Sequence, residues 1–224
     1  MNILIACEES QTVCKAFREK GHNAFSCDIV ECSGGRPEWH ILQDVTELLN
    51  GNVCFETMDG KLHTIHGKWD MILAFPPCTH LAVSGAKHFE KKRKNGIQFE
   101  SIKFFKMFLD CDCNKVAIEN PINIIGSDYI KKHFPCYGDL PNCSQYIQPY
   151  EYGNASRKKT CLWLKGLPNL KPTNIVVPDI VSYTCSNGKK VTFSKDYGSG
   201  NNNSGARRSK TYPGIAKAMA EQWG

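Results

Sequence analysis

The amino-acid sequence predicts an α/β protein with a doubly wound, mostly parallel sheet. Two short apolar runs, NILIA at residues 2–6 and MILAF at residues 71–75, have the composition of strands that are covered on both faces. The first run leads into a turn and then a helical segment, which is the opening unit of such a fold. With 224 residues, of which 41% are hydrophobic, the chain is long enough for one good-sized core.

The composition favours a polyanionic partner and a location inside the cell. The formal net charge is +6, and basic residues cluster at 87–94 and 207–210, although a charge run usually marks only a solvated face. No secretory signal precedes the first strand, and no apolar run approaches the roughly 18 residues of a membrane span. We therefore expect a cytoplasmic protein.

The chain contains twelve cysteines, a number that raises the question of disulfides or metal. Inside a cell thiols stay reduced, and we expect most of these cysteines to pack as small hydrophobes. The best zinc grouping joins Cys111 and Cys113 to Cys136 and Cys143, but it lacks the paired Cys-x-x-Cys spacing of zinc sites. No metal site is predicted.

The first strand is followed by a helix with recognisable ends. Ser10 is expected to cap this helix, which runs to about Lys20. Gly21 is its stop signal. The turn between the strand and the helix reads ACEESQ.

The second and third expected strands each carry an aspartate near the carboxyl end. Residues 24–29 place Asp28 roughly 20 residues beyond the first turn, where nucleoside-binding α/β folds use a carboxylate to accept hydrogen bonds from ribose hydroxyls. The alternative is an aspartate in an ordinary turn. Asp44, near the end of the strand at 40–45, could contact a base edge or cap the helix at 46–49.

The central stretch of the chain ends a buried strand at a cysteine. Residues 51–67 indicate a hairpin or surface excursion before the apolar strand at 71–75. Pro76 and Pro77 then remove two amide donors, so the strand stops and Cys78 lies in a stiff turn at the carboxyl edge of the sheet. Open α/β sheets bind ligands at this edge. The alternative is a loop with a structural thiol.

The next elements return the chain to the sheet. Residues 79–98 are too polar for the core and are expected to form a loop over the site. Residues 101–109 have helical spacing, and residues 115–119 form a fifth strand that Pro121 ends. In a sheet of order 3-2-1-4-5, this strand lies beside the strand that ends at Cys78.

Cys78 and Glu119 are therefore expected to face one crevice. The motif IENP at residues 118–121 is built like the Pro-Pro-Cys motif, with a strand that ends at proline. A thiolate beside a carboxyl group suits covalent catalysis on an electron-poor ring, because sulfur adds to carbon while the acid donates to a ring nitrogen.

The remaining residues add an edge pair of strands and a closing helix. Residues 145–151 and 160–165 look like an antiparallel pair joined by the turn at Gly153, and residues 174–194 contain short strands. Residues 197–205, YGSGNNNSG, indicate a flexible low-complexity loop. An alanine-rich helix at residues 215–223 follows.

These residues resemble the cytosine-C5 DNA methyltransferases. The FPPC sequence that ends at Cys78 is similar to the Pro-Cys nucleophile motif of that family, and Ile118-Glu119-Asn120 is similar to its Glu-Asn motif. The order first strand, Asp28, Asp44, Cys78, Glu119 also matches the family. The whole chain resembles short phage- and prophage-type proteins described as cytosine methyltransferase-like.

The resemblance implies a Rossmann-like class I S-adenosylmethionine-dependent methyltransferase fold in the cytoplasm of a bacterial host. Residues 1–165 would be the methyltransferase-like core, with an antiparallel edge pair. Residues 166–205 would be a reduced target-recognition region, and residues 206–224 a C-terminal helix that packs back on the core.

The resemblance also implies residue roles. Cys78 would attack C6 of a cytosine rotated out of double-stranded DNA, Glu119 would assist at N3, and Arg157 and Lys159 would hold the target base. Asp28 would bind the ribose of S-adenosylmethionine and Asp44 its adenine. The full set of expected cofactor-binding residues is Ala6, Cys7, Glu8, Ser10, Asp28, Asp44, Pro76, Ser209 and Thr211.

Three features depart from the family pattern. Glu8 and Glu9 stand where the family has a glycine-rich turn, and they could bind the cofactor's ammonium group or displace its usual pose. Lys159 replaces an arginine and gives up bidentate geometry. Residues 167–205 are far shorter than a full target-recognition domain, which predicts a short or loose sequence preference or help from another protein.

Two alternative functions follow from these departures. The chain could be a nucleic-acid-binding phage factor that keeps the fold without methylation. The ACEESQ turn and the short target-recognition region favour this alternative. It could instead be an enzyme of the same fold that modifies RNA or a free pyrimidine nucleotide.

Overall fold

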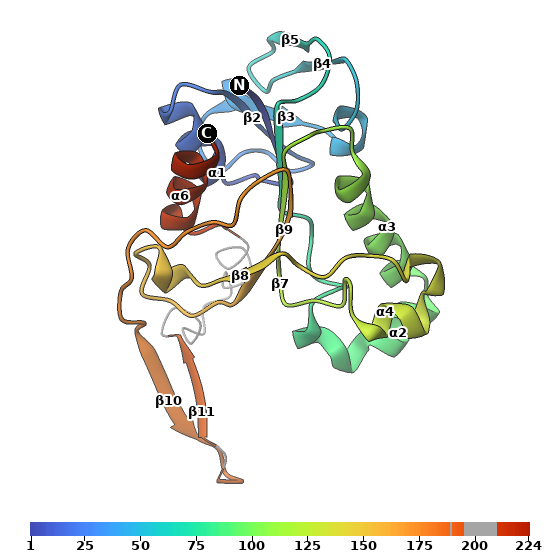
Figure 1. The fold of residues 1–224 in the computed structure, drawn as a ribbon, viewed down its shortest axis with the longest axis vertical. Helices are drawn as coiled ribbons and strands as arrows, with labels where there is room; N and C mark the ends of the chain where they lie inside the picture. The colour runs from blue at the N-terminus through green and yellow to red at the C-terminus, as the bar shows by residue number, and fades with distance from the viewer. Residues whose placement is uncertain (189, 195–209) are drawn as a thin grey trace.

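The computed structural model describes residues 1–188, 190–194 and 210–224, which include a central seven-stranded sheet. The strand order is β3-β2-β1-β6-β7-β9-β8 (Figure 1). Neighbouring strands from β3 to β7 are parallel, whereas β9 is antiparallel to β7 and β8. The predicted order of the five parallel strands and the antiparallel edge pair are confirmed. The strands of this sheet are β1 (Asn2–Ala6), β2 (Asn23–Asp28), β3 (His40–Leu42), β6 (Met71–Ala74), β7 (Val116–Pro121), β8 (Gln145–Ile147) and β9 (Thr160–Lys165).

Helices cover both faces of the sheet, which is why the central strands are apolar throughout. In β1, Leu4 belongs to one buried cluster and Ile3 to another, because successive side chains point to opposite faces. Helix α3 lies on the first face, and α1 and α6 pack together on the second (Figure 1). The helices are α1 (Thr12–Glu19), α2 (Phe89–Lys94), α3 (Ile97–Asp110), α4 (Asp128–His133) and α6 (Pro213–Trp223).

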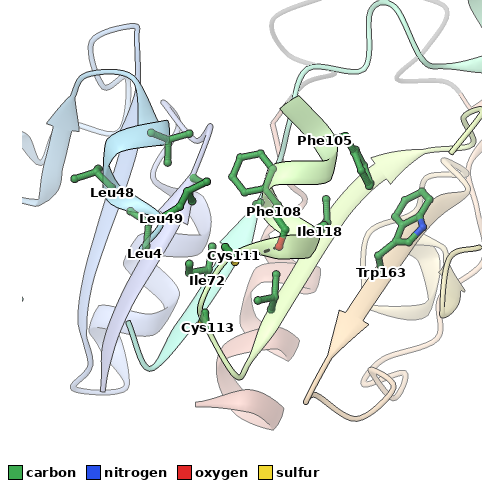
Figure 2. Close-up of a cluster of buried hydrophobic side chains, with 14 of the residues drawn as sticks. Leu4, Leu48, Leu49, Ile72, Phe105, Phe108, Cys111, Cys113, Ile118 and Trp163 are labelled. Carbon is green, nitrogen blue, oxygen red and sulfur yellow. Dashed lines mark hydrogen bonds between the residues drawn. The ribbon is translucent and has the colours of Figure 1, made fainter. Parts of the chain in front are cut away.

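Aromatic packing under α3 fixes the strand that carries Glu119. Phe105 and Phe108 of α3 are fully buried in one cluster with Ile118 of β7 and Trp163 of β9, and Phe105 lies on the side toward Trp163 (Figure 2). The rings of Phe105 and Trp163 meet edge to face with centroids 5.0 Å apart. Burial of each such side chain stabilises the fold by roughly 2 kcal/mol, so α3 holds β7 and β9 in one layer.

Two predicted strands are shorter in the structure because a capped turn follows each of them. Strand β3 ends at Leu42, and Asp44 Oδ1 accepts a hydrogen bond of 2.9 Å from the Thr46 amide as the N-cap of a 3₁₀ helix, Val45–Leu48. Of the two roles considered for Asp44, the structure therefore shows the cap. Strand β8 ends at Ile147 because a proline opens the 3₁₀ helix Pro149–Glu151.

The prediction of a loop over residues 79–98 is wrong for the second half of this segment. The chain forms a 3₁₀ helix at Val83–His88 and continues into α2, whose first residue, Phe89, is buried. Sequence reasoning missed this helix because its charged residues face solvent and leave only one apolar anchor. Helix α3 starts at Ile97, four residues before the predicted start, since Gly96 with φ 78° separates it from α2.

Two hairpins lie outside the central sheet. Strands β4 (Val53–Glu56) and β5 (Leu62–Ile65) confirm the hairpin predicted at residues 51–67. Strands β10 (Ile180–Thr184) and β11 (Lys190–Ser194) confirm short strands in the later segment. The loop predicted at residues 197–205 lies outside the described residues. No helix in the described ranges is long and apolar enough to cross a membrane.

Gly214 provides a test of how closely α6 packs against the backbone of Tyr152. A Cβ atom added at Gly214 would lie 1.7 Å from the backbone carbonyl oxygen of Tyr152, and backbone cannot move aside cheaply. We expect Gly214→Ala to lower the free energy of unfolding by about 2 kcal/mol in urea denaturation. Gly85→Ala is the control, because its Cβ would meet the flexible end of Lys92 at 3.4 Å and the Thr79 carbonyl oxygen at 3.9 Å, both ordinary contacts. Equal urea midpoints for Gly214→Ala and wild type would contradict this close packing of α6.

Candidate active site

The ends of β6 and β7 bring the two sequence motifs to one edge of the sheet. Ala74, the last residue of β6, pairs with Ile118 in β7, so Glu119 begins the part of β7 that extends past β6. On the other side of β6, the Phe75 amide donates to the carbonyl oxygen of Ala6 at 2.9 Å. Pro76, Pro77 and Cys78 therefore leave the sheet between the ends of β1 and β7.

A buried amide side chain fastens the two motifs together. Asn120 is 1% exposed, and its Nδ2 atom donates to the carbonyl oxygen of Pro76 at 2.7 Å. The Oδ1 atom of Asn120 in turn accepts a hydrogen bond of 2.9 Å from Asn123 Nδ2. Because both ends of the amide are engaged, its orientation is fixed, and with it the position of the diproline turn beside Glu119.

Cys78 begins a tight turn that is held by backbone hydrogen bonds and by a bridge to the segment after β7. Its carbonyl oxygen accepts hydrogen bonds from the amides of Leu81 at 3.0 Å and Ala82 at 2.9 Å. Ala82 forms an antiparallel bridge with Asn123, in the segment that follows β7. The Cys78 side chain is partly exposed and is not part of a disulfide, so the thiol is accessible at this edge of the sheet.

The residues after Cys78 are tethered by α2, α3 and α4. Gln98 Nε2 donates to the carbonyl oxygen of His80 at 3.0 Å, and Tyr129 donates to Gln98 Oε1 at 2.9 Å. Lys92 of α2 donates to the carbonyl oxygen of Thr79. Burial, and then the charge of Lys92, lower the pKa of His80. His80 Nδ1 is buried and has no hydrogen-bond partner in the described part of the chain.

Glu119 lies beside residues of the antiparallel strand β9. Glu119 pairs with Leu162, and because side chains alternate along a strand, Thr160 shares its face of the sheet. Lys158 lies just before β9, and its charge acts on Glu119. Burial raises the pKa of the Glu119 carboxyl, while the Lys158 charge and a side-chain hydrogen bond with Thr160 act in the opposite direction. The net shift is upward, which favours the protonated acid.

The predicted pair of base-holding residues takes a different position. Lys159 Nζ lies 4.0 Å from the centroid of the Tyr146 ring, and the Arg157 amide donates to Ser194 Oγ at 2.5 Å at the base of β11. The structure thus brings Lys158, rather than Arg157 or Lys159, to Glu119. Motif spacing missed Lys158 because an Arg-x-Arg pattern selects positions 157 and 159 and does not show which side chain of the run turns toward β7.

The first turn is built around Glu8, which caps α1. Glu8 is 4% exposed; its Oε1 accepts from the Val13 amide at 2.7 Å and its Oε2 from the Cys14 amide at 3.1 Å. The predicted cap, Ser10, instead places its hydroxyl 3.4 Å from Glu8 Oε1, and the N-cap position is Gln11 with φ 57°. Since both oxygens of Glu8 bind helix amides, this carboxylate has a structural role that the sequence did not predict.

Glu9, unlike Glu8, has a carboxylate that is not occupied by the amides of α1. Its Oε2 atom is buried and has no hydrogen-bond partner among the described residues. Its Oε1 atom lies 3.7 Å from Lys210 Nζ, which also donates to Ser33 Oγ at 2.8 Å. Thr211 follows Lys210, so the segment before α6 returns to the first turn as expected. Ser209 is not among the described residues.

The two aspartates lie near the first turn. Asp28 ends β2 half-buried, and its Oδ1 accepts a hydrogen bond of 3.2 Å from the Val30 amide. Burial, followed by nearby charges that include those of Asp28 and Asp44, raises the pKa of the Cys7 thiol. Cys7 itself has φ 59°, a conformation that glycine adopts more easily.

Cys111 and Cys113, considered above as zinc ligands, are core residues. Cys111 Sγ donates to the carbonyl oxygen of Phe108 at 3.1 Å, and Cys113 Sγ to that of Trp69 at 3.3 Å. Figure 2 shows both cysteines in the apolar cluster under α3. Over residues 1–188, 190–194 and 210–224, no group of three or more His, Cys, Asp or Glu side chains is arranged to hold a metal ion.

Comparisons with known proteins do not identify a family. No family model matches the chain, and none of the curated proteins matches its sequence. The function must therefore be argued from the geometry of the site.

Glu8 predicts a pH dependence of stability. Burial raises the pKa of its carboxyl to about 7, from 4.5 in the absence of the fold. Between these values the folded protein holds a proton that the unfolded chain has released, so the free energy of unfolding falls as pH rises. The shift corresponds to roughly 3 kcal/mol.

Glu8→Gln cannot titrate and is the matched variant. We expect the difference in unfolding free energy between wild type and Glu8→Gln to change by roughly 3 kcal/mol between pH 4.5 and 7.5, measured by urea denaturation. Parallel pH profiles for the two proteins would show that Glu8 is not buried as described.

Proposed function

We propose that this chain is an S-adenosylmethionine-dependent methyltransferase that acts on C5 of cytosine in DNA. One observation carries the proposal: Cys78 and Glu119 follow adjacent parallel strands, and the hydrogen bond from Asn120 to Pro76 holds their two motifs together. A nucleophile and an acid at one crevice suit addition to an electron-poor ring.

The residues of the site divide the chemistry between them. Cys78 Sγ forms a bond to C6 of the cytosine, and Glu119 donates a proton to N3, so the electron pair of the C5–C6 bond becomes available at C5. S-adenosylmethionine supplies the methyl group when bound. Loss of the C5 proton to solvent and of the proton on N3 to Glu119 then allows the Sγ–C6 bond to break and frees Cys78.

The electrostatics of Glu119 support its role as the acid. Its raised pKa keeps the carboxyl protonated over a wider pH range, as donation to N3 requires. After donation, the Lys158 ammonium stabilises the carboxylate that forms. Thr160 on the same face helps to orient the group.

The edge formed by β1 and β2 fits a cofactor that carries hydroxyls and positive charge. The unpartnered, buried Oε2 atom of Glu9 is suited to a ligand ammonium, and the half-buried Asp28 carboxylate to a ribose diol. Glu8 is excluded from this role by its bonds to α1. Glu9, Asp28 and Ala6 would thus hold the methionine and ribose parts of the cofactor.

Charge around the crevice supports a nucleic-acid substrate. Helix α2, which tethers the segment after Cys78, ends in four consecutive basic residues. Strand β9 is preceded by three more, Arg157 to Lys159. Cations on both sides of the crevice suit a phosphate backbone from which one base is rotated into the site.

A second function, binding of nucleic acid without methyl transfer, is favoured by the first turn. Glu8 fills the space beneath that turn, and Cys7 has a left-handed backbone where glycine is usual, so the backbone approach to a cofactor differs from the family pattern. Calorimetry separates the two functions, because this second function requires salt-dependent DNA binding with no affinity for S-adenosylmethionine.

The nucleophile is tested by substitution in a methyl-transfer assay with labelled S-adenosylmethionine and double-stranded DNA. We expect Cys78→Ser to abolish incorporation of label into 5-methylcytosine, and Glu119→Gln to lower it by at least about 100-fold, because neither variant supplies both groups. Circular dichroism serves as the control for folding. Unchanged methylation by Cys78→Ser would rule out the mechanism.

Lys158 is tested by comparison with its neighbour. We expect Lys158→Met to lower kcat roughly tenfold and to move the alkaline limb of the pH–rate profile to higher pH, because removal of a nearby cation raises the pKa of Glu119. The exposed Lys20→Met is the control for loss of a surface charge. A larger loss in Lys159→Met than in Lys158→Met would restore the assignment based on motif spacing.

A further inference from the structure

Residues 174–180, here called the apolar segment, lead into β10 (Figure 1) and expose aliphatic side chains to solvent. Ile175 is 72% exposed, Val177 is 87% exposed, and Ile180 at the start of β10 is 47% exposed. Single exposed apolar residues are ordinary on a protein surface, but a group of them at one place marks an interaction site. The apolar segment is therefore a candidate surface for a partner.

Backbone hydrogen bonds hold the apolar segment against the residues that precede β9. The Val176 amide donates to the carbonyl oxygen of Tyr150 at 2.9 Å, and the Asp179 amide donates to that of Ala155 at 2.8 Å. These bonds satisfy polar groups on the inner side of the segment and leave its outer side chains in solvent. A partner would thus meet a surface that is already ordered, which lowers the entropic cost of binding.

A groove of about 510 Å³ joins the apolar segment to one cation. Arg157 is the only charged residue of its lining, and its side chain is exposed. The Arg157 guanidinium group forms no ion pair with any residue that the structure describes. The groove is lined by Tyr150, Arg157, Ile175, Val176, Val177, Pro178 and Ile180.

An apolar groove with one arginine suits a protein segment better than a nucleic acid. A phosphate could pair with Arg157, but the hydrated backbone of a nucleic acid would leave Ile175 and Val177 without an apolar partner. Aliphatic or aromatic side chains of a protein would bury both residues, and a carboxylate could form two hydrogen bonds with the guanidinium group. Tyrosine and arginine are also the residues that contribute most often to the affinity of protein interfaces.

We propose that this groove is the docking site for an acidic, apolar segment of another protein, whose carboxylate binds Arg157 and whose apolar side chains pack on Ile175 and Val177. The residue after Arg157 is Lys158, whose charge acts on Glu119. The partner would therefore sit beside the candidate active site without occupying it. The inference does not require methyl transfer, because a protein that only binds nucleic acid would carry the same groove.

The test measures peptide binding, so that it can fail separately from the proposed enzyme. The full chain is immobilised and used to select binders from a displayed library of random dodecapeptides, and the enriched peptides are synthesised and measured by fluorescence polarisation. We expect the enriched peptides to combine an aspartate or glutamate with aliphatic or aromatic residues. Replacing that acid by its amide should weaken binding about tenfold, and so should Arg157→Gln, because each change removes a charge-assisted hydrogen bond.

A second pair of variants tests the apolar contact. Val177→Ser should weaken binding of the same peptides about tenfold, because it removes aliphatic surface from the groove. Leu62→Ser is the matched control and should bind them like wild type, since Leu62 is 74% exposed on the separate hairpin of β4 and β5. Both positions are exposed, so neither substitution disturbs the core.

Four results would overturn the docking site. The first is a selection that enriches no acidic, apolar peptide, and the second is peptide binding that neither Arg157→Gln nor Val177→Ser weakens. Displacement of the bound peptide by a short DNA duplex would assign the groove to a nucleic acid instead. Concentration-dependent dimers in sedimentation that Val177→Ser abolishes would assign it to a second copy of this chain.

Discussion

The hydrogen bond from Asn120 to the carbonyl oxygen of Pro76 is the contact on which the site depends. Two prolines follow β6 and take the chain out of the sheet, so the carbonyl group of the buried Pro76 has no strand partner. The Asn120 amide satisfies it from the neighbouring strand, at a position where an apolar residue would leave it unpaired at a cost of roughly 1–3 kcal/mol. The same contact holds the turn that leads to Cys78 against the strand that contains Glu119, so one side chain contributes to both stability and geometry.

The turn between β1 and α1 is stabilised by a charged residue, Glu8, and is not rich in glycine. A glycine-rich turn leaves the amides at the start of a helix open to a ligand, whereas here Glu8 occupies two of those amides itself. The turn is thereby made rigid from within, and its backbone no longer provides the anion site of other α/β proteins. Recognition at this edge must then come from carboxylates such as Glu9 and Asp28, which suit positive and hydroxyl-bearing ligands.

The strand order and the neighbouring positions of the strands that precede Cys78 and contain Glu119 were predictable, because apolar runs, prolines and parallel topology act over many residues at once. Features that depend on one contact were not predictable. Nothing in ACEESQ distinguishes a glutamate that caps a helix from one that faces a ligand, and Phe89 alone could not identify α2 among charged residues. Lys158 was missed for a third reason: it belongs to a run of three basic residues before β9, and a motif does not show which of them lies near Glu119.

The antiparallel direction of β9 has a consequence for how the sequence can change. Because β9 is antiparallel to β7, the residues at the start of β9, and not those at its end, lie near Glu119. An insertion or deletion of one residue there would turn every side chain upstream to the opposite face. Because Arg157, Lys158 and Lys159 are all basic, a slip of one residue there would still leave a cation two positions before Thr160. The positive charge beside Glu119 is therefore expected to survive a change of one residue in the length of this segment.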